Sequence, residues 1–200
     1  LEFESIPGAL RERGGANEDQ NLNEYLGFEL RRPKYSRSGL FIDEEAKIIT
    51  QSSGLPDCSS LTVNGIYKYK IAAENKHLDL VLLAPEQVLK PLSVIEYTTT
   101  MPKIGEQVAL SSFPYQGKLN RSTLTEGTVR ELEDLGGDKR KFRVSIPVNP
   151  GDSGGGLFDL SGNFIGLHLA EPSYINLDAQ IVLKAREITK FLGEVGLSEL

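Results

Sequence analysis

Short apolar segments, separated by turns rich in Gly, Pro and Asp, recur along most of the 200-residue chain. Clear examples are Leu40–Ile42, Leu61–Val63, Val108–Leu110, Phe142–Ile146 and Phe164–Leu167. Apolar segments this short, bounded by turn-forming residues, are typical of β-strands, because helices in globular proteins need longer periodic stretches. The pattern therefore predicts an all-β protein.

One segment near the C-terminus has a different period. Its apolar residues Ile188, Phe191, Leu192 and Val195 recur at spacings of three and four, which places them on one face of a helix. We therefore predict a helix over Ala185–Val195 whose apolar face covers the strands that precede it.

The N-terminal segment differs from the rest, because it mixes charged residues with Asn, Gln and paired glycines. We assign residues 1–27 to an N-terminal arm or helix, with a helical pattern at Asn21–Gly27, and residues 28–200 to one domain. The first three residues, Leu-Glu-Phe, resemble a cloning remnant, so we expect the natural N-terminus to be missing. Whether the natural protein also has a leader or a membrane anchor is left open.

Composition narrows the classes of function. A chain of 200 residues with 39% hydrophobic and 25% charged residues can bury one substantial core. No apolar run reaches the ~18 residues of a membrane-spanning helix. A net charge of −6 argues against nucleic-acid binding, and the one basic run, Lys139–Arg143, is interpreted as the exposed rim of a strand. The single cysteine, Cys58, excludes an internal disulfide framework.

The most informative segment is Asn149–Gly156, which reads Asn-Pro-Gly-Asp-Ser-Gly-Gly-Gly. Glycines on both sides of Ser153 permit a tight turn that exposes its hydroxyl group. The same turn can direct the N–H groups of Gly151 and Ser153 at one point, as the oxyanion of an acyl-transfer intermediate requires. An ordinary hairpin turn is the alternative, although this order of residues is much rarer than a glycine-rich turn.

Five segments in order, this one included, resemble the HtrA/Deg branch of the trypsin-like serine proteases. The other four are Ser38–Ser53, Asp79–Leu83, Gly105–Pro114 and Gly127–Arg130. The resemblance covers the chain from about Ser38 to its end. It implies two packed six-stranded antiparallel β-barrels with a C-terminal helix and an active-site cleft between the barrels.

The resemblance assigns Ser153 to the nucleophile, Asp79 to the triad acid and Gly151 to the oxyanion hole. The family's general base is a histidine in the pattern Thr-Asn-Ala-His, and the matching position here is Ser53, in Thr-Gln-Ser-Ser. Without an imidazole, the weakly acidic hydroxyl of Ser153 has no proton acceptor at neutral pH, and most of the acceleration is lost. We interpret the chain as a pseudoprotease in which Asp79 accepts hydrogen bonds from Ser52, Ser53 or a buried water.

Two histidines remain as candidate bases. His77 would lie on the same side as Asp79 if the strand had already begun there, but a solvated loop histidine is the simpler interpretation. The resemblance places His168 at the wall of the specificity pocket, close to Ser153. A half-buried strand histidine that forms hydrogen bonds with the backbone is a simpler interpretation than a base. A metal site of His77, Asp79 and His168 has suitable ligand types but no supporting spacing, so we predict no metal and no cofactor.

Two main functions follow. The first is a non-catalytic module that binds a peptide or protein, added as a strand near Leu167–Glu171, with His168, Leu169 and Ala170 as the binding residues. The second is an active endopeptidase with a relocated or partner-supplied base. A weaker third is scaffolding of an active protease in a hetero-oligomer. No signal peptide is recognisable, and the resemblance favours a periplasmic or otherwise exported bacterial protein.

Overall fold

The computed structural model describes residues 36–55, 58–97, 101–115, 121–171 and 179–197. The predicted N-terminal arm, residues 1–27 with its helical pattern, lies outside the described residues. Within the described part, the chain forms strands β1 to β11 and the C-terminal helix α2. The predicted all-β class with a C-terminal helix is confirmed.

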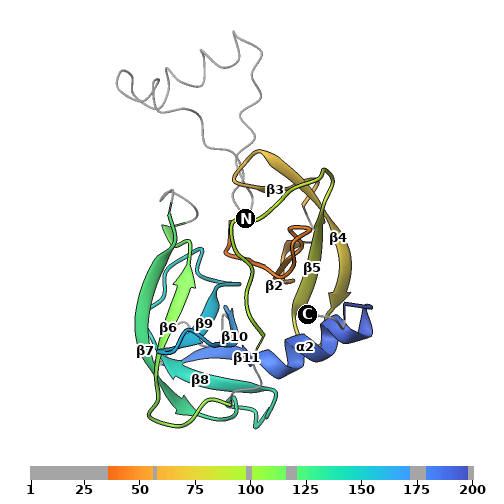
Figure 1. Ribbon diagram of the computed structural model, residues 1–200. Coiled ribbons are helices and arrows are strands. Elements are labelled where there is room, and N and C mark those ends of the chain that lie inside the picture. Colours follow the sequence, from red (N-terminus) through yellow and green to blue (C-terminus); the bar gives the residue numbers. More distant parts are fainter. Residues whose placement is uncertain (1–35, 56–57, 98–100, 116–120, 172–178, 198–200) are drawn as a thin grey trace, which may run out of the picture.

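The first half of the domain is an antiparallel five-stranded sheet in the order β1-β2-β5-β4-β3 (Figure 1). Its strands are β1 (Leu40–Phe41), β2 (Ile48–Gln51), β3 (Leu61–Val63), β4 (Tyr67–Asn75) and β5 (Leu80–Pro85). The described strands do not close into the six-stranded barrel that the resemblance implies for this half. Closure would require the edge strands β1 and β3 to pair, and these have only two and three residues.

The second half closes into the expected six-stranded barrel, in the order β10-β11-β8-β7-β6-β9. Its strands are β6 (Gln107–Ser112), β7 (Thr123–Glu131), β8 (Lys141–Ser145), β9 (Gly156–Asp159), β10 (Phe164–Leu169) and β11 (Gln180–Lys184). Alternation sets the inside of the barrel: in β8, Phe142 and Val144 are fully buried, while Lys141 and Arg143 are not.

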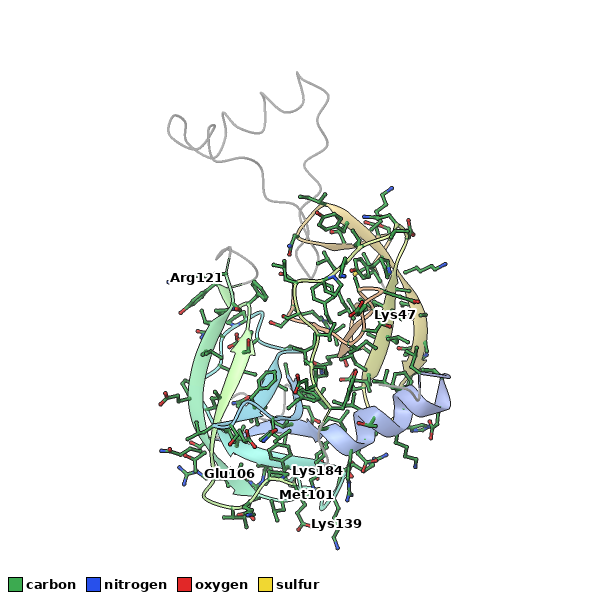
Figure 2. The ribbon with its side chains drawn as sticks, viewed as in Figure 1. Lys47, Met101, Glu106, Arg121, Lys139 and Lys184 are labelled. Atoms are coloured by element: carbon green, nitrogen blue, oxygen red, sulfur yellow. The ribbon has the colours of Figure 1, made fainter. Side chains whose placement is uncertain are left out.

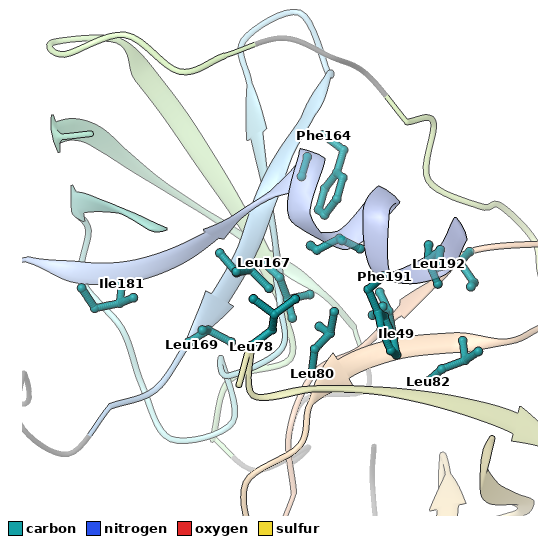
Figure 3. Packing of buried hydrophobic residues seen from close by; sticks show 14 residues of the cluster. Ile49, Leu78, Leu80, Leu82, Phe164, Leu167, Leu169, Ile181, Phe191 and Leu192 are labelled. Carbon is teal, nitrogen blue, oxygen red and sulfur yellow. The ribbon is translucent and has the colours of Figure 1, made fainter. Parts of the chain in front are cut away.

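Helix α2 (Ala185–Glu194) joins the two halves instead of covering the barrel alone. Its Phe191 and Leu192 belong to one buried cluster with residues of both halves (Figure 3). The cluster includes Ile49, Leu80 and Leu82 from the sheet and Phe164, Leu167, Leu169 and Ile181 from the barrel. Val195, predicted on the buried face, is 37% exposed because the helix has already ended. No helix in the described part is long and apolar enough to cross a membrane.

A buried lysine fixes the loop between β7 and β8. The ammonium group of Lys184 donates to the carbonyl oxygens of Leu132 (2.8 Å) and Lys139 (2.6 Å), and Figure 2 shows Lys184 and Lys139 at the same end of the barrel. Burial lowers the pKa of Lys184. In the predicted basic run that begins at Lys139, Lys141 forms an ion pair with Glu171 (2.7 Å).

Candidate active site

Ser153 lies in the turn between β8 and β9, at the boundary of the two halves. Gly151 and Gly154 on either side of it have φ angles of +105° and +82°, which glycine adopts readily. The hydroxyl of half-buried Ser153 donates to the side-chain oxygen of Gln51. Neither the N–H of Gly151 nor that of Ser153 donates to another described residue. These two donors are therefore available to a ligand oxygen.

Ser38, buried in the first half, holds the turn in place. Its N–H donates to the carbonyl oxygen of Ser153 (2.9 Å), and its hydroxyl donates to that of Gly151 (2.7 Å). The same hydroxyl accepts from the N–H of Phe113 (2.8 Å), and the hydroxyl of Thr50 donates to the carbonyl oxygen of Ser38 (2.6 Å). This positioning role of Ser38 was not predicted, because in the sequence Ser38 is only the first residue of a matched segment.

A buried carboxylate also stabilises the turn through hydrogen bonds. Asp152 is 1% exposed and accepts hydrogen bonds from the hydroxyl of Ser112 (2.7 Å) and the N–H of Asn149 (2.6 Å). A carboxylate can be buried without an ion pair only where such donors satisfy it. The main chain on both sides of the nucleophile is therefore fixed by hydrogen bonds, from Asn149 to Gly155.

Asp79 forms hydrogen bonds directly with Ser53, the residue expected at the position of the family's histidine. One carboxylate oxygen accepts from the N–H of Ser53 (2.7 Å), and the other accepts from its hydroxyl (2.6 Å). The other serine named as a candidate donor behaves differently: the hydroxyl of Ser52 donates to Glu74, while its N–H donates to the backbone oxygen of Asp79 (3.0 Å). Ser53 thus satisfies the acid but does not reach Ser153 among the described hydrogen bonds.

Gln51 connects the nucleophile to the acid. Its side-chain oxygen accepts from the hydroxyl of Ser153, and its side-chain nitrogen donates to the carboxylate of Asp79 (2.6 Å). A carboxamide therefore stands where the imidazole of a Ser-His-Asp triad would stand. A neutral carboxamide accepts a hydrogen bond but, unlike an imidazole, does not take up a proton at neutral pH.

The carboxamide of Gln51 has two further partners on the barrel. Its nitrogen donates to the carbonyl oxygen of Ala170 (3.0 Å), and its oxygen accepts from the N–H of Ala170 (3.1 Å). Both donors and both acceptor positions are thereby used, and only one orientation of the amide suits these partners. The guanidinium of Arg37 also donates to the backbone oxygen of Gln51 (2.7 Å).

Gln51 was not predicted as a site residue, because the family's general base aligns with Ser53 and not with Gln51. A signal was present: the Asn of the family pattern Thr-Asn-Ala-His is replaced here by Gln, which is one methylene longer. Nothing in the sequence alone shows where that longer side chain would point.

The two histidines lie elsewhere, and neither ring forms a hydrogen bond with Ser153. Residues 76–79 form a turn and β5 begins only at Leu80, so the strand alternation considered for exposed His77 and Asp79 does not apply. His168 is on β10, where it is 2% exposed, not half-buried as expected. The described residues contain no group of three or more His, Cys, Asp and Glu placed to hold a metal.

The predicted binding residues also differ in access. The side chains of His168 and Leu169 are buried, whereas Ala170 is exposed. The ring of His168 has one nitrogen 3.5 Å from the side-chain oxygen of Gln180, and the other lacks a hydrogen-bond partner in the described part. Burial lowers the pKa of His168, against the opposing effects of the Asp152 backbone and Gln180.

His168 makes stability depend on pH. Since its folded-state pKa lies below the unfolded value of about 6.5, the unfolded chain binds a proton first as pH falls. The stability that the protein gains from burying the neutral ring of His168 is fully present above pH ~6.5. It is lost as the pH falls below this value, towards the folded-state pKa. Urea denaturation at pH 5.5 and pH 7.5 gives the free energy of unfolding at each pH. We expect the difference between the two values to be ~1 kcal/mol smaller in His168→Gln than in wild type. His77→Gln is the control, and an unchanged difference in His168→Gln would contradict the prediction.

Comparison with known proteins agrees with the fold. The trypsin-like peptidase domain family matches residues 37–167. A "probable periplasmic serine endoprotease DegP-like" of Rhizobium meliloti (strain 1021) is 27% identical over 146 residues, which is 70% of this chain and 28% of the relative. The uncharacterized protein y4bJ of Sinorhizobium fredii (strain NBRC 101917 / NGR234) is 29% identical over 175 residues, 80% of this chain and 27% of the relative.

Solved structures show the same fold. The inactive form of the Rv3671c protease from M. tuberculosis superposes with a TM-score of 0.63 at 24% identity, over 80% of this chain and 86% of the other. The serine endoprotease from Yersinia pestis gives a TM-score of 0.67 at 19% identity, over 86% and 60%. Since the family match covers more than half of the chain, the chain belongs to the trypsin-like peptidase domain family. It spans little more than a quarter of the two curated relatives.

Proposed function

We propose that this chain is a catalytically inactive serine-protease homologue that binds an extended peptide or protein segment in the former substrate groove. The observation that carries the proposal is the hydrogen bond from the hydroxyl of Ser153 to the carboxamide of Gln51. In an active enzyme that hydroxyl donates to an imidazole, which removes its proton during attack on the carbonyl carbon. Gln51 offers the hydrogen bond without the proton transfer.

The loss of the base has a predictable size. Positioned general bases contribute about 10²- to 10⁴-fold to rate, and a triad that lacks one member keeps only the share supplied by the oxyanion hole and by binding. The two histidines do not replace it, because exposed His77 lies in a turn and the ring of His168 is buried beside Gln180. The protein is therefore expected to bind peptides without hydrolysing them at a significant rate.

Support for binding comes from what the site retains. The turn around Ser153 is held by Ser38 and Asp152, and the N–H groups of Gly151 and Ser153 remain unused within the described part. Two free N–H groups beside a hydroxyl can receive a peptide carbonyl oxygen without any chemistry. An exported location is proposed with this function, since the curated name of the Rhizobium meliloti relative contains the word periplasmic.

Labelling with a fluorophosphonate tests the absence of catalysis. This reagent phosphonylates the hydroxyl of an activated serine, so wild-type protein should stay unlabelled under conditions that label trypsin to completion. Intact-protein mass spectrometry detects the adduct, and Ser153→Ala supplies the background. Labelling of the wild type that disappears in Ser153→Ala would overturn the proposal in favour of an active endopeptidase. His77→Gln and His168→Gln would then show which histidine acts as base.

A further inference from the structure

Strand β10 ends its pairing with the nucleophile segment at His168. The N–H of His168 donates to the carbonyl oxygen of Gly155 (2.9 Å), and the N–H of Gly154 donates to the carbonyl oxygen of His168 (2.9 Å). In an antiparallel ladder, the next residue with both backbone groups on the same side is two positions further, at Ala170. The opposite segment leaves the ladder there: Gly154 has a φ of +82°, and the carbonyl oxygen of Ser153 accepts from the N–H of Ser38 instead (2.9 Å). Ala170 is thus left without a strand partner on this side.

The carboxamide of Gln51 completes this position. It accepts from the N–H of Ala170 (3.1 Å) and donates to the carbonyl oxygen of the same residue (3.0 Å). A peptide chain that pairs with Ala170 would make the same two hydrogen bonds with the N–H and C=O groups of its backbone. Gln51 is 2% exposed in this conformation, whereas Ala170 is exposed.

The geometry points to an intramolecular substitute for the ligand: we propose that the carboxamide of Gln51 occupies the backbone position of an extended peptide, which binds at Ala170 by displacing it. This inference rests on the proposed peptide-binding function and specifies where the peptide pairs. It also restricts the predicted binding edge, Leu167–Glu171, to the position of Ala170. Leu167 already pairs with both β9 and β11, and Leu169 pairs with β11.

Displacement leaves few polar groups unsatisfied. The incoming peptide restores both hydrogen bonds of Ala170. Asp79 loses the amide of Gln51 but keeps the N–H (2.7 Å) and the hydroxyl (2.6 Å) of Ser53. The hydroxyl of Ser153 becomes free to donate to the ligand, beside the N–H of Gly151. Ser53 therefore has a role of its own, because it donates hydrogen bonds to the carboxylate of Asp79 in both conformations.

Gln51 should consequently lower the apparent affinity for peptides. A ligand that binds only the displaced conformation is weakened by the fraction of molecules in that conformation. Removing the carboxamide removes the competition, and we expect Gln51→Ala to bind peptides about tenfold more tightly than wild type. The backbone N–H of Ala170 should also lose its protection from hydrogen exchange in the peptide-free variant.

The test uses the full chain and an equimolar mixture of fluorescein-labelled, N-acetylated decapeptides of random sequence, titrated by fluorescence polarisation. Gln107→Ala, an exposed glutamine on β6, is the matched control and should bind as wild type does. Tighter binding by Gln51→Ala than by both others supports the inference. If Gln51→Ala fails to fold, Gln51→Asn makes the same test, because its shorter amide should not span from Asp79 to Ala170.

The outcomes separate the two proposals. Equal, measurable affinity of wild type and Gln51→Ala would overturn the displacement of Gln51 and leave peptide binding in place. Absence of binding by every variant would overturn peptide binding itself, and the inference with it. Faster hydrogen exchange at Ala170 in Gln51→Ala together with unchanged affinity would show that Gln51 covers this position without competing with the ligand, which also overturns the inference.

Discussion

The double variant Gln51→Asn/Ser53→His is expected to react with a fluorophosphonate about 10³-fold faster than wild type, which is the usual contribution of a positioned general base. Ser53 already lies within hydrogen-bond distance of Asp79, so an imidazole at position 53 gains the carboxylate that orients it. The shorter Asn at position 51 matches the family pattern and withdraws the carboxamide from Ser153. The rate of adduct formation, followed by mass spectrometry, measures the effect.

The single variants are the controls for this prediction. Ser53→His alone retains Gln51, which competes for both the hydroxyl of Ser153 and the carboxylate of Asp79, so its gain should be much smaller. Gln51→Asn alone supplies no base and should stay as unreactive as wild type. If Ser53→His alone reacts as fast as the double variant, Gln51 does not obstruct the base. If the double variant stays unreactive despite native stability, the groove lacks the geometry for catalysis.

Gly154→Ala is expected to destabilise the fold by ~3 kcal/mol or more, the range typical of steric conflict added to backbone strain. A Cβ atom at Gly154 would lie 2.2 Å from both the carbonyl oxygen of Ser38 and the hydroxyl oxygen of Thr50. Neither atom can move freely, because Thr50 is fully buried and donates to that same carbonyl. Urea unfolding measures the loss.

Gly162→Ala isolates the cause of that loss. Gly162 has a φ of +85°, close to that of Gly154, but nothing lies within 4 Å of its added Cβ. It should lose only the ~1 kcal/mol that a left-handed backbone costs a residue with a side chain. Equal losses in the two variants would show that backbone strain, and not the close contact with Ser38 and Thr50, explains the requirement for glycine.

The strand pattern and the matched segments predicted most of the fold. Alternation and turn residues located segments such as Phe142–Ile146, because half-buried strands repeat every two residues. The open edge of the first sheet was not predictable, since closure depends on whether the short strands β1 and β3 pair across space. Exposed Val195 was placed on the buried face because periodicity does not fix where a helix ends.

The candidate site was predictable only in part. The tight turn around Ser153 could be predicted from the order of its glycines, because it depends on local chain geometry, whereas the assignment of Ser53 to the position of the family's histidine stays a prediction. The connection through Gln51 could not, because it requires Asp79, Ser153 and Ala170, which lie 28, 102 and 119 residues from Gln51, to meet at its side chain. His168 shows the same limit: a strand position did not reveal that its ring is fully buried.

The hydrogen bonds of Gln51 also bear on how the two halves of the domain are held together. Gln51 and Asp79 belong to the first half of the domain, whereas Ser153 and Ala170 belong to the second half, so the carboxamide of Gln51, like Ser38, links the halves at the site. Helix α2 joins them through the apolar cluster that holds Phe191 and Leu192. A ligand that displaces the carboxamide would therefore remove one polar link between the halves, while the helix and the hydrogen bonds from Ser38 to the Ser153 turn would still hold them together.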